Sequence, residues 1–223
     1  MALVVTLGGT ASASGPPIIA LRLTAPLVGM ASSPSGNGYW ISAGDGGVFA
    51  FGDAQFYGSM GGHPLNQPIV GIAAAPGGGY WEVASDGGIF AFNAPFYGSM
   101  GGHPLNKPIV SMTGDQLSGG YRMVASDGGI FSFHSGFYGS MGGQPLAGAI
   151  IGAAAAGASD GYWMVGSDGG VFSYAAPFEG AIHNLAPPPS ASKGLAIAAI
   201  AQSQVGQGNN YGPGQWCAYF VSW

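Results

Sequence analysis

Residues 80–102 read YWEVASDGGIFAFNAPFYGSMGG, and they decide the fold because most of the chain is built from copies of this stretch. Its Asp-Gly-Gly step occurs four times, and each aspartate lies 41 residues after the previous one. Two further motifs keep nearly the same spacing, an aromatic pair before the aspartate and a Phe-Tyr-Gly-Ser-Met-Gly-Gly run after it. The chain therefore contains four copies of one structural unit.

The copies are easiest to follow through three positions. The aspartates are Asp45, Asp86, Asp127 and Asp168; the pairs are Tyr39-Trp40, Tyr80-Trp81, Tyr121-Arg122 and Tyr162-Trp163; and the runs are residues 56–62, 96–102 and 137–143, with a reduced copy at Phe178-Glu179-Gly180.

The copy over residues 68–102 shows where the strands of one unit lie. Pro76-Gly77-Gly78-Gly79, Asp86-Gly87-Gly88 and Asn93-Ala94-Pro95 are turn sequences, because glycine, asparagine and proline supply the backbone angles that turns need. Between them lie segments rich in β-branched and aromatic residues. They predict four strands, at residues 69–74, 80–85, 89–92 and 96–100.

Both faces of these predicted strands are apolar, as Trp81 and Val83 on one face and Tyr80 and Ala84 on the other illustrate. A sheet with two apolar faces has to be buried between other layers. A period of about 40 to 45 residues with several strands per repeat is typical of β-propeller blades. The predicted fold is mainly β, a propeller-like array of four four-stranded repeats over residues 26–185, plus a short α-helical C-terminal fragment. The repeats resemble the β-propeller-like blades of secreted bacterial proteins.

Two questions of architecture stay open. A β-solenoid also buries both faces of its strands, but its coils are usually shorter than this repeat, so it is the second choice. Four blades could close into a ring alone, which we prefer, or form half of an eight-bladed ring made by a homodimer.

Composition excludes several classes of protein. Four Lys+Arg and a net charge of −5 argue against nucleic acid as a partner, since phosphate binding needs basic patches. No apolar run reaches the roughly 18 residues of a membrane span. The Gly-Gly steps lie in hairpins and not before helices, so no phosphate-binding loop and no cofactor are expected.

The repeated polar and aromatic residues have candidate roles. We expect the four Asp-Gly-Gly aspartates to cap their own turns. His63 and His103 occupy matching positions, but Gln144 replaces them in the third copy, so no metal site is expected. Tyr57, Tyr97 and Tyr138 are the candidate ligand-binding residues, because sugars stack on such rings, although packing in the core would also explain them.

The N-terminus indicates export. An apolar run over residues 2–7 precedes Ala11-Ser12-Ala13, a small-residue cleavage pattern, and we expect residues 1–14 to be the remnant of a secretory signal and the protein to be secreted. Residues 186–192 (APPPSAS) predict an exposed linker between the repeats and a terminal unit.

The terminal unit, residues 193–223, contains the only cysteine. An alanine-rich segment that ends near Gly206 predicts one helix, and a Gly/Asn-rich loop separates it from a second helix that begins near Gln215. Cys217 would lie in the first turn of the second helix, where the helix dipole stabilises a thiolate.

Residues 194–223 resemble the start of the CHAP domains, cysteine amidases or peptidases that act on peptidoglycan. The resemblance rests on the alanine-rich helix and on Trp216-Cys217-Ala218-Tyr219-Phe220-Val221-Ser222-Trp223. It implies that Cys217 is the nucleophile. CHAP domains also need a histidine and a polar partner downstream of the cysteine, so we expect the 223-residue chain itself to have no hydrolase activity.

Two functions are compatible with these features. The first is a fragment of a secreted cell-wall hydrolase, in which the repeats bind or target peptidoglycan or another cell-wall glycan. The second is a secreted carbohydrate- or protein-binding repeat scaffold without catalytic activity.

Overall fold

The computed structural model describes residues 23–157 and 159–182, and these are mainly β. They form four antiparallel sheets of three strands each, consistent with a propeller-like arrangement. We number the sheets 1 to 4 along the chain. The strands are β1 (Leu27–Ser32), β2 (Gly38–Ala43) and β3 (Val48–Gly52) in sheet 1; β4 (Ile69–Ala74), β5 (Tyr80–Ala84) and β6 (Ile89–Phe92) in sheet 2; β7 (Ile109–Gly114), β8 (Tyr121–Ala125) and β9 (Ile130–Phe133) in sheet 3; and β10 (Ile150–Ala155), β11 (Tyr162–Gly166) and β12 (Val171–Tyr174) in sheet 4.

Some predicted segments lie outside the described residues. They are the signal remnant at residues 1–14, the linker at 186–192, and the helices of residues 193–223 with Cys217. No helix within residues 23–157 and 159–182 has the length and hydrophobicity to cross a membrane.

The second strand and the third are joined by the Asp-Gly-Gly hairpin, whose chemistry is as predicted. In each sheet the aspartate Oδ1 accepts the backbone N–H of the second glycine, at 3.0 to 3.1 Å. The first glycine, Gly87 in sheet 2, has a φ of +80°, and a Cβ there would lie 2.6 Å from the Cβ of Met100. Turn conformation and close packing therefore both require glycine at this position.

The predicted fourth strand of each unit is wrong. Residues 96–100 form no strand, because their backbone groups do not hydrogen-bond to a neighbouring strand and have other partners. The Met100 N–H donates to Gly87 O of the hairpin at 2.9 Å, and Gly98 has a φ of +131°, which breaks an extended conformation. The segment instead contacts both its own sheet and the next one.

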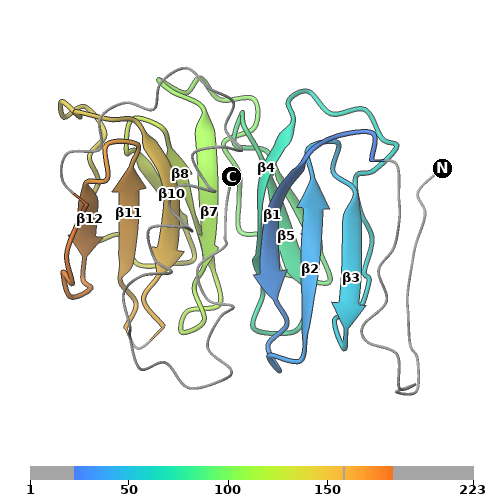
Figure 1. Cartoon of the computed structure of the whole chain (residues 1–223). Coiled ribbons are helices and arrows are strands. Elements are labelled where there is room, and N and C mark those ends of the chain that lie inside the picture. The colour runs from blue at the N-terminus through green and yellow to red at the C-terminus, as the bar shows by residue number, and fades with distance from the viewer. Residues whose placement is uncertain (1–22, 158, 183–223) are drawn as a thin grey trace, which may run out of the picture.

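The four sheets follow one another so that their first strands are neighbours, β1 beside β4, β4 beside β7, and β7 beside β10. Figure 1 shows sheet 1 (blue) and sheet 4 (orange) at opposite ends of this array. Among the described residues, β1 does not pack against β10. The described residues therefore do not close the ring of four blades that we preferred from the sequence.

We call the contact between successive sheets a seam. In each sheet the face toward the preceding sheet is its leading face, and the other is its trailing face. At the first two seams a trailing-face tryptophan packs on a leading-face tyrosine, Trp40 on Tyr80 and Trp81 on Tyr121, with ring centroids 5.1 and 5.0 Å apart. These four side chains are buried. These two seams are thus centred on large aromatic rings, which remove much apolar area from water.

The seam tyrosine also holds the segment that replaces the fourth strand. The Tyr121 hydroxyl accepts the Tyr97 N–H at 3.1 Å and donates to Gly98 O at 2.6 Å. Tyr80 and Tyr162 make the same two bonds in their seams. One side chain therefore joins a sheet, its seam and the connecting segment.

The first seam departs from the others at a buried polar pair. Ser42 of sheet 1 donates to Glu82 Oε1 of sheet 2 at 2.5 Å, and both side chains are fully buried. The equivalent pairs at the other seams are apolar, Val83 with Met123 and Val124 with Met164. Glu82 Oε2 has no hydrogen-bond partner. Burial raises the pKa of Glu82 to about 8, although the bonds from Ser42 and the Met60 backbone oppose the increase.

We expect Glu82→Gln to stabilise the protein at neutral pH. A carboxyl whose pKa is raised by folding binds its proton more tightly in the folded state, so folded stability falls as the pH rises from about 4.5 to about 8. At pH 7 this corresponds to about 3 kcal/mol. Urea unfolding from pH 4 to pH 8 measures it. The gain should grow with pH for Glu82→Gln and for the double variant Ser42→Val/Glu82→Met, and a gain that does not change with pH would contradict the prediction.

Candidate binding surface

The three candidate tyrosines lie on the segments that cover the seams. The backbone N–H groups of Tyr57, Tyr97 and Tyr138 donate to the seam tyrosines, which fixes the position of each ring's Cα. The rings of Tyr57 and Tyr138 are exposed, and Tyr97 is half-buried, stacked on His134 with centroids 4.4 Å apart. The structure therefore places these tyrosines at equivalent positions along the array, but in different surroundings.

A second aromatic series lies beside them and was missed in the sequence. Phe96, Phe137 and Phe178 are 59 to 60% exposed, whereas Phe56, their equivalent in the first unit, packs against the first seam. The prediction of a fourth strand hid them, because a strand in a stacked sheet would bury alternate residues. The sequence feature that could have identified these phenylalanines is their position directly after a turn and before Tyr-Gly or its equivalent. We call Phe96, Phe137, Phe178, Tyr57, Tyr97 and Tyr138 the aromatic row.

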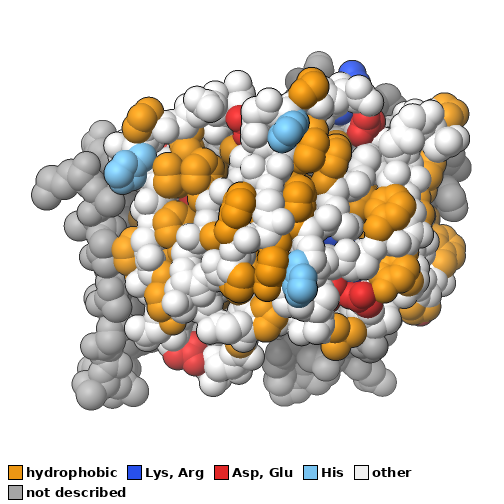
Figure 2. Space-filling model, turned by 180° about the vertical axis from the view of Figure 1, so that it is seen from behind, with side chains coloured by type: hydrophobic (Ala, Val, Ile, Leu, Met, Phe, Trp, Pro, Cys, Tyr) orange, Lys and Arg blue, Asp and Glu red, His pale blue; other side chains and the backbone are white. Residues whose placement is uncertain are grey.

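The character of the surface agrees with an apolar binding role. Figure 2 shows hydrophobic side chains spread in rows across the face opposite to that of Figure 1, with few charged groups among them. Large contiguous apolar patches often mark interaction sites, whereas single exposed apolar residues are normal on a protein surface. The described part of the chain therefore offers an extended apolar contact surface.

Sheet 3 carries an arginine where the other sheets have the seam tryptophan. Arg122 Nε donates to Gly136 O at 2.8 Å, as the indole N–H of Trp81 donates to Pro95 O at the same distance. Its guanidinium carbon lies 5.0 Å from the centroid of the Tyr162 ring, so it also takes the place of the indole at the seam. Arg122 is thus a substitute for tryptophan in position and in contacts.

The charge of Arg122 is balanced by two aspartates. Its Nη2 lies 3.0 Å from Asp115 Oδ2 and 3.1 Å from Asp160 Oδ1, and Arg122 and Asp115 are buried. Asp160 is partly exposed and accepts the Tyr138 hydroxyl at 2.7 Å. This ion cluster therefore reaches the surface at the aromatic row and holds the Tyr138 ring in place. Burial alone would raise the pKa of Asp115, but hydrogen bonds that include those from Ser118 and Ser135 hold that pKa well below its usual range.

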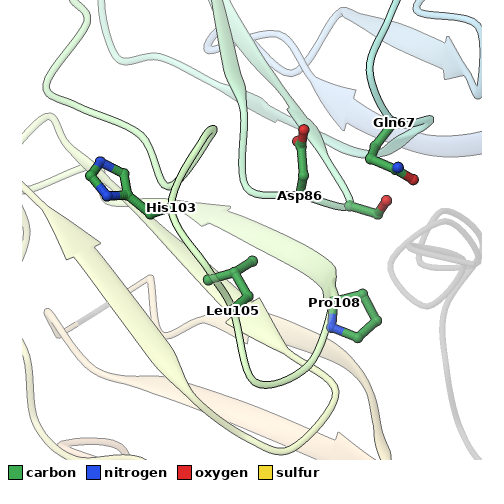
Figure 3. A pocket seen from close by; sticks show the side chains of 6 residues that line it. Gln67, Asp86, His103, Leu105 and Pro108 are labelled. Carbon is green, nitrogen blue, oxygen red and sulfur yellow. The ribbon is translucent and has the colours of Figure 1, made fainter.

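A shallow hollow lies on the Asp86 hairpin of sheet 2. Its volume is about 240 Å³, and it is lined by Gln67, Ser85, Asp86, His103, Leu105 and Pro108. Figure 3 shows His103 and Gln67 on opposite sides of it with Asp86 between them. One Asp86 oxygen is already bonded to its own turn. The hollow is smaller than most ligand pockets, which measure about 300 to 1,000 Å³, so we do not regard it as the main site.

The matching histidines do not form a cluster. His63 and His103 are both exposed, on separate connecting segments. Within residues 23–157 and 159–182, no group of three or more His, Cys, Asp or Glu side chains could hold a metal ion.

Comparisons with known proteins find a distant structural neighbour. No protein-family model matches the sequence, and a search of curated proteins gives no match, so the resemblance of residues 194–223 to CHAP domains has no support from them. Among solved structures the chain is similar to the β-propeller domain of Cps50 (Swd1) from Myceliophteria thermophila, with a TM-score of 0.44 and 9% identity. That match covers 71% of this chain and 56% of the propeller domain, so the chain spans little more than half of it.

We expect Arg122→Met to lower the free energy of unfolding by about 3 to 5 kcal/mol, because it leaves the buried Asp115 without its cation. The double variant Arg122→Trp/Asp115→Ala, which gives sheet 3 the residues of sheet 2, should recover most of the loss. Urea unfolding at pH 7 measures both changes.

The loss of folded stability at acid pH provides the control for these two variants. A carboxyl with a lowered pKa stabilises the folded state above its ordinary pKa of about 4, and this contribution is lost as the pH falls toward the folded value. The wild type should therefore lose more stability below about pH 4 than the double variant. Equal acid profiles would show that Asp115 does not contribute in this way.

Proposed function

We propose that the four-sheet array is a binding scaffold and that the aromatic row is its ligand surface. The observation that carries this is the equal exposure of Phe96, Phe137 and Phe178 at the same position of three successive units. Rings exposed once per repeat offer a ligand the same contact at regular steps, which suits a polymer of repeated units. A repeat scaffold with a binding role is also what the propeller-like fold suggests.

The ligand class that fits best is carbohydrate. Aromatic rings present flat apolar faces, on which the C–H faces of sugars stack. The net charge of −5 with four Lys+Arg disfavours polyanions such as nucleic acid. A cell-wall glycan such as peptidoglycan is therefore the proposed ligand, and the protein is proposed to be secreted, as the apolar run at residues 2–7 suggests. A protein ligand is the alternative for the same surface.

Within the row, Tyr138, which follows Phe137 directly, is held by polar contacts. Tyr138 donates to Asp160, and the guanidinium carbon of Arg122 lies 6.0 Å from its ring centroid. A side chain held in one position before binding loses less conformational freedom when the ligand arrives. We therefore assign the strongest contact to this part of the row.

A more specific proposal concerns residues 194–223. We propose that the array serves as the targeting region of a cell-wall hydrolase whose nucleophile is Cys217. Support comes from the sequence around Cys217, which lies outside the described residues. Cys217 would attack the amide carbonyl, the C–N bond would break and the amine would leave, which gives a thioester. Water would then hydrolyse the thioester to the carboxylic acid and free the thiol. The coding sequence after Trp223 tests this proposal: a histidine followed by Asn, Asp or Glu supports it, and an immediate stop codon contradicts it.

We expect Phe137→Ala to weaken binding to purified peptidoglycan about tenfold, because the ring loses its stacking contact. Co-sedimentation of the 223-residue chain with insoluble peptidoglycan measures the affinity. Leu117→Ala is the matched control, since Leu117 is exposed and apolar but lies in the turn between β7 and β8. Equal binding by wild type and Phe137→Ala, or no retention of the wild type, would contradict the carbohydrate proposal.

A further inference from the structure

The two ends of the array carry the two unused halves of a seam. Every internal seam joins the trailing face of one sheet to the leading face of the next. Sheet 1 has a leading face without a preceding sheet, and sheet 4 has a trailing face without a following one, among the described residues. These two faces can be compared residue by residue with their buried equivalents.

The leading face of sheet 1 exposes residues that are buried everywhere else in the repeat. Leu27 is 46% exposed, whereas Ile69, Ile109 and Ile150 at the same position are almost fully buried. Tyr39 is 39% exposed, whereas its equivalents Tyr80, Tyr121 and Tyr162 are buried against the trailing face of the preceding sheet. The leading face of sheet 1 thus has the residues that form a seam elsewhere, but among the described residues no sheet packs on it.

The trailing face of sheet 4 shows the complementary feature. Val165 is 36% exposed, whereas Val83 and Val124 at the same position are buried within their seams. Ile151 is 40% exposed, whereas Val70 and Val110 are packed against the second and third seams. Trp163 donates its indole N–H to Pro177 O at 2.7 Å, so it is already in the orientation of a seam tryptophan.

The pairing rule of the internal seams says what would fit between these faces. At every internal seam tryptophan or arginine lies opposite tyrosine. At the second and third seams an apolar residue of one sheet also lies opposite an apolar residue of the next, where the first seam has Ser42 and Glu82. Trp163 would face Tyr39, and Val165 would face Ile41, as Trp81 faces Tyr121 and Val83 lies with Met123. No charged side chain stands at these four end positions.

We propose that a second copy of this chain docks on these faces, with the trailing face of sheet 4 of each copy against the leading face of sheet 1 of the other. Two such seams close a ring of eight sheets. Propellers of about four to eight blades are usual, so two copies reach a known size, whereas three would exceed it. The contact continues an interface that the chain already forms three times within itself.

The aromatic row is not part of this contact. Phe178 follows sheet 4, which has no next sheet, yet it is as exposed as Phe137, which lies beside a formed seam. At the second and third seams the position therefore stays exposed although the seam has formed, whereas Phe56 packs against the first seam. The proposed ring would present the rows of both copies to a ligand, and it does not depend on the ligand proposal.

Mass measurement of the 223-residue chain by light scattering tests the proposal. At about 100 μM we expect twice the 22.1 kDa of one chain, with dissociation to single chains on dilution. Val165→Asp should shift the mass to one chain, because it places a carboxylate in the seam. Leu117→Asp, an exposed apolar residue outside both faces, should leave the dimer intact, and circular dichroism should show all variants folded.

Mixing two variants distinguishes this ring from other dimers. Leu27→Asp damages only the leading face and Val165→Asp only the trailing face, so each should be a single chain alone. A mixture retains one undamaged seam between unlike copies, and a heterodimer should reappear. Single chains for the wild type at about 100 μM, or a mixture that stays as single chains, would overturn the proposal; in the first case the end faces are left to a further sheet or to another segment of the protein.

Discussion

A three-stranded sheet with two apolar faces is not stable alone, and this constraint organises the part of the molecule that the structure describes. Each sheet here solves it by packing on its neighbours through a seam with an aromatic centre. The seam tyrosine contributes its ring to the apolar contact and its hydroxyl to the connecting segment, where it accepts one N–H and donates to one carbonyl. The segment has no ladder partner, so without that hydroxyl two backbone groups beside the seam would lack these partners. Packing and backbone satisfaction thus depend on one residue per seam.

The seams differ in detail while keeping this plan. One accommodates a buried Ser42–Glu82 pair in place of two apolar side chains, and another replaces tryptophan by Arg122 with two aspartates for its charge. Both changes occur at side chains that point into a seam, and neither alters the strands or their register. A repeat that needs its neighbours also explains the apolar end faces. The outer side of the connecting segments takes no part in the seams, and the aromatic row lies there.

Most of the strands and part of the candidate site could be predicted from the sequence, because the same turn and aromatic residues recur in every repeat. The Asp-Gly-Gly hairpins predicted the second and third strands of each unit, since aspartate capping and positive-φ glycine leave little choice of turn, and the preceding turn, such as residues 76–79, predicted the first. The fourth strand was wrong because aromatic residues in 96–100 suit a strand, and only the structure reveals that Tyr121 and Gly87 take their backbone bonds.

Tyr57, Tyr97 and Tyr138 were found as candidates, but the exposed Phe96, Phe137 and Phe178 were not, because their exposure depends on how the segment crosses the seam. Arg122 was visible as a departure from the repeat, but its aspartate partners are distant in sequence. Ring closure could not be predicted, because it depends on the geometry between sheets.

The central claim is that the seam tyrosine holds the array together, and the most direct test compares two tyrosines at the same position of the repeat. Tyr121 is buried with both hydroxyl bonds formed, whereas Tyr39 is at the exposed leading face of sheet 1. Urea unfolding of Tyr121→Phe should show a loss of about 1 to 3 kcal/mol, the cost of leaving a buried donor and acceptor without partners. At protein concentrations where the wild type is a single chain, Tyr39→Phe should stay within about 0.5 kcal/mol of it, as is usual for surface substitutions. Equal stabilities for the two variants would contradict the account.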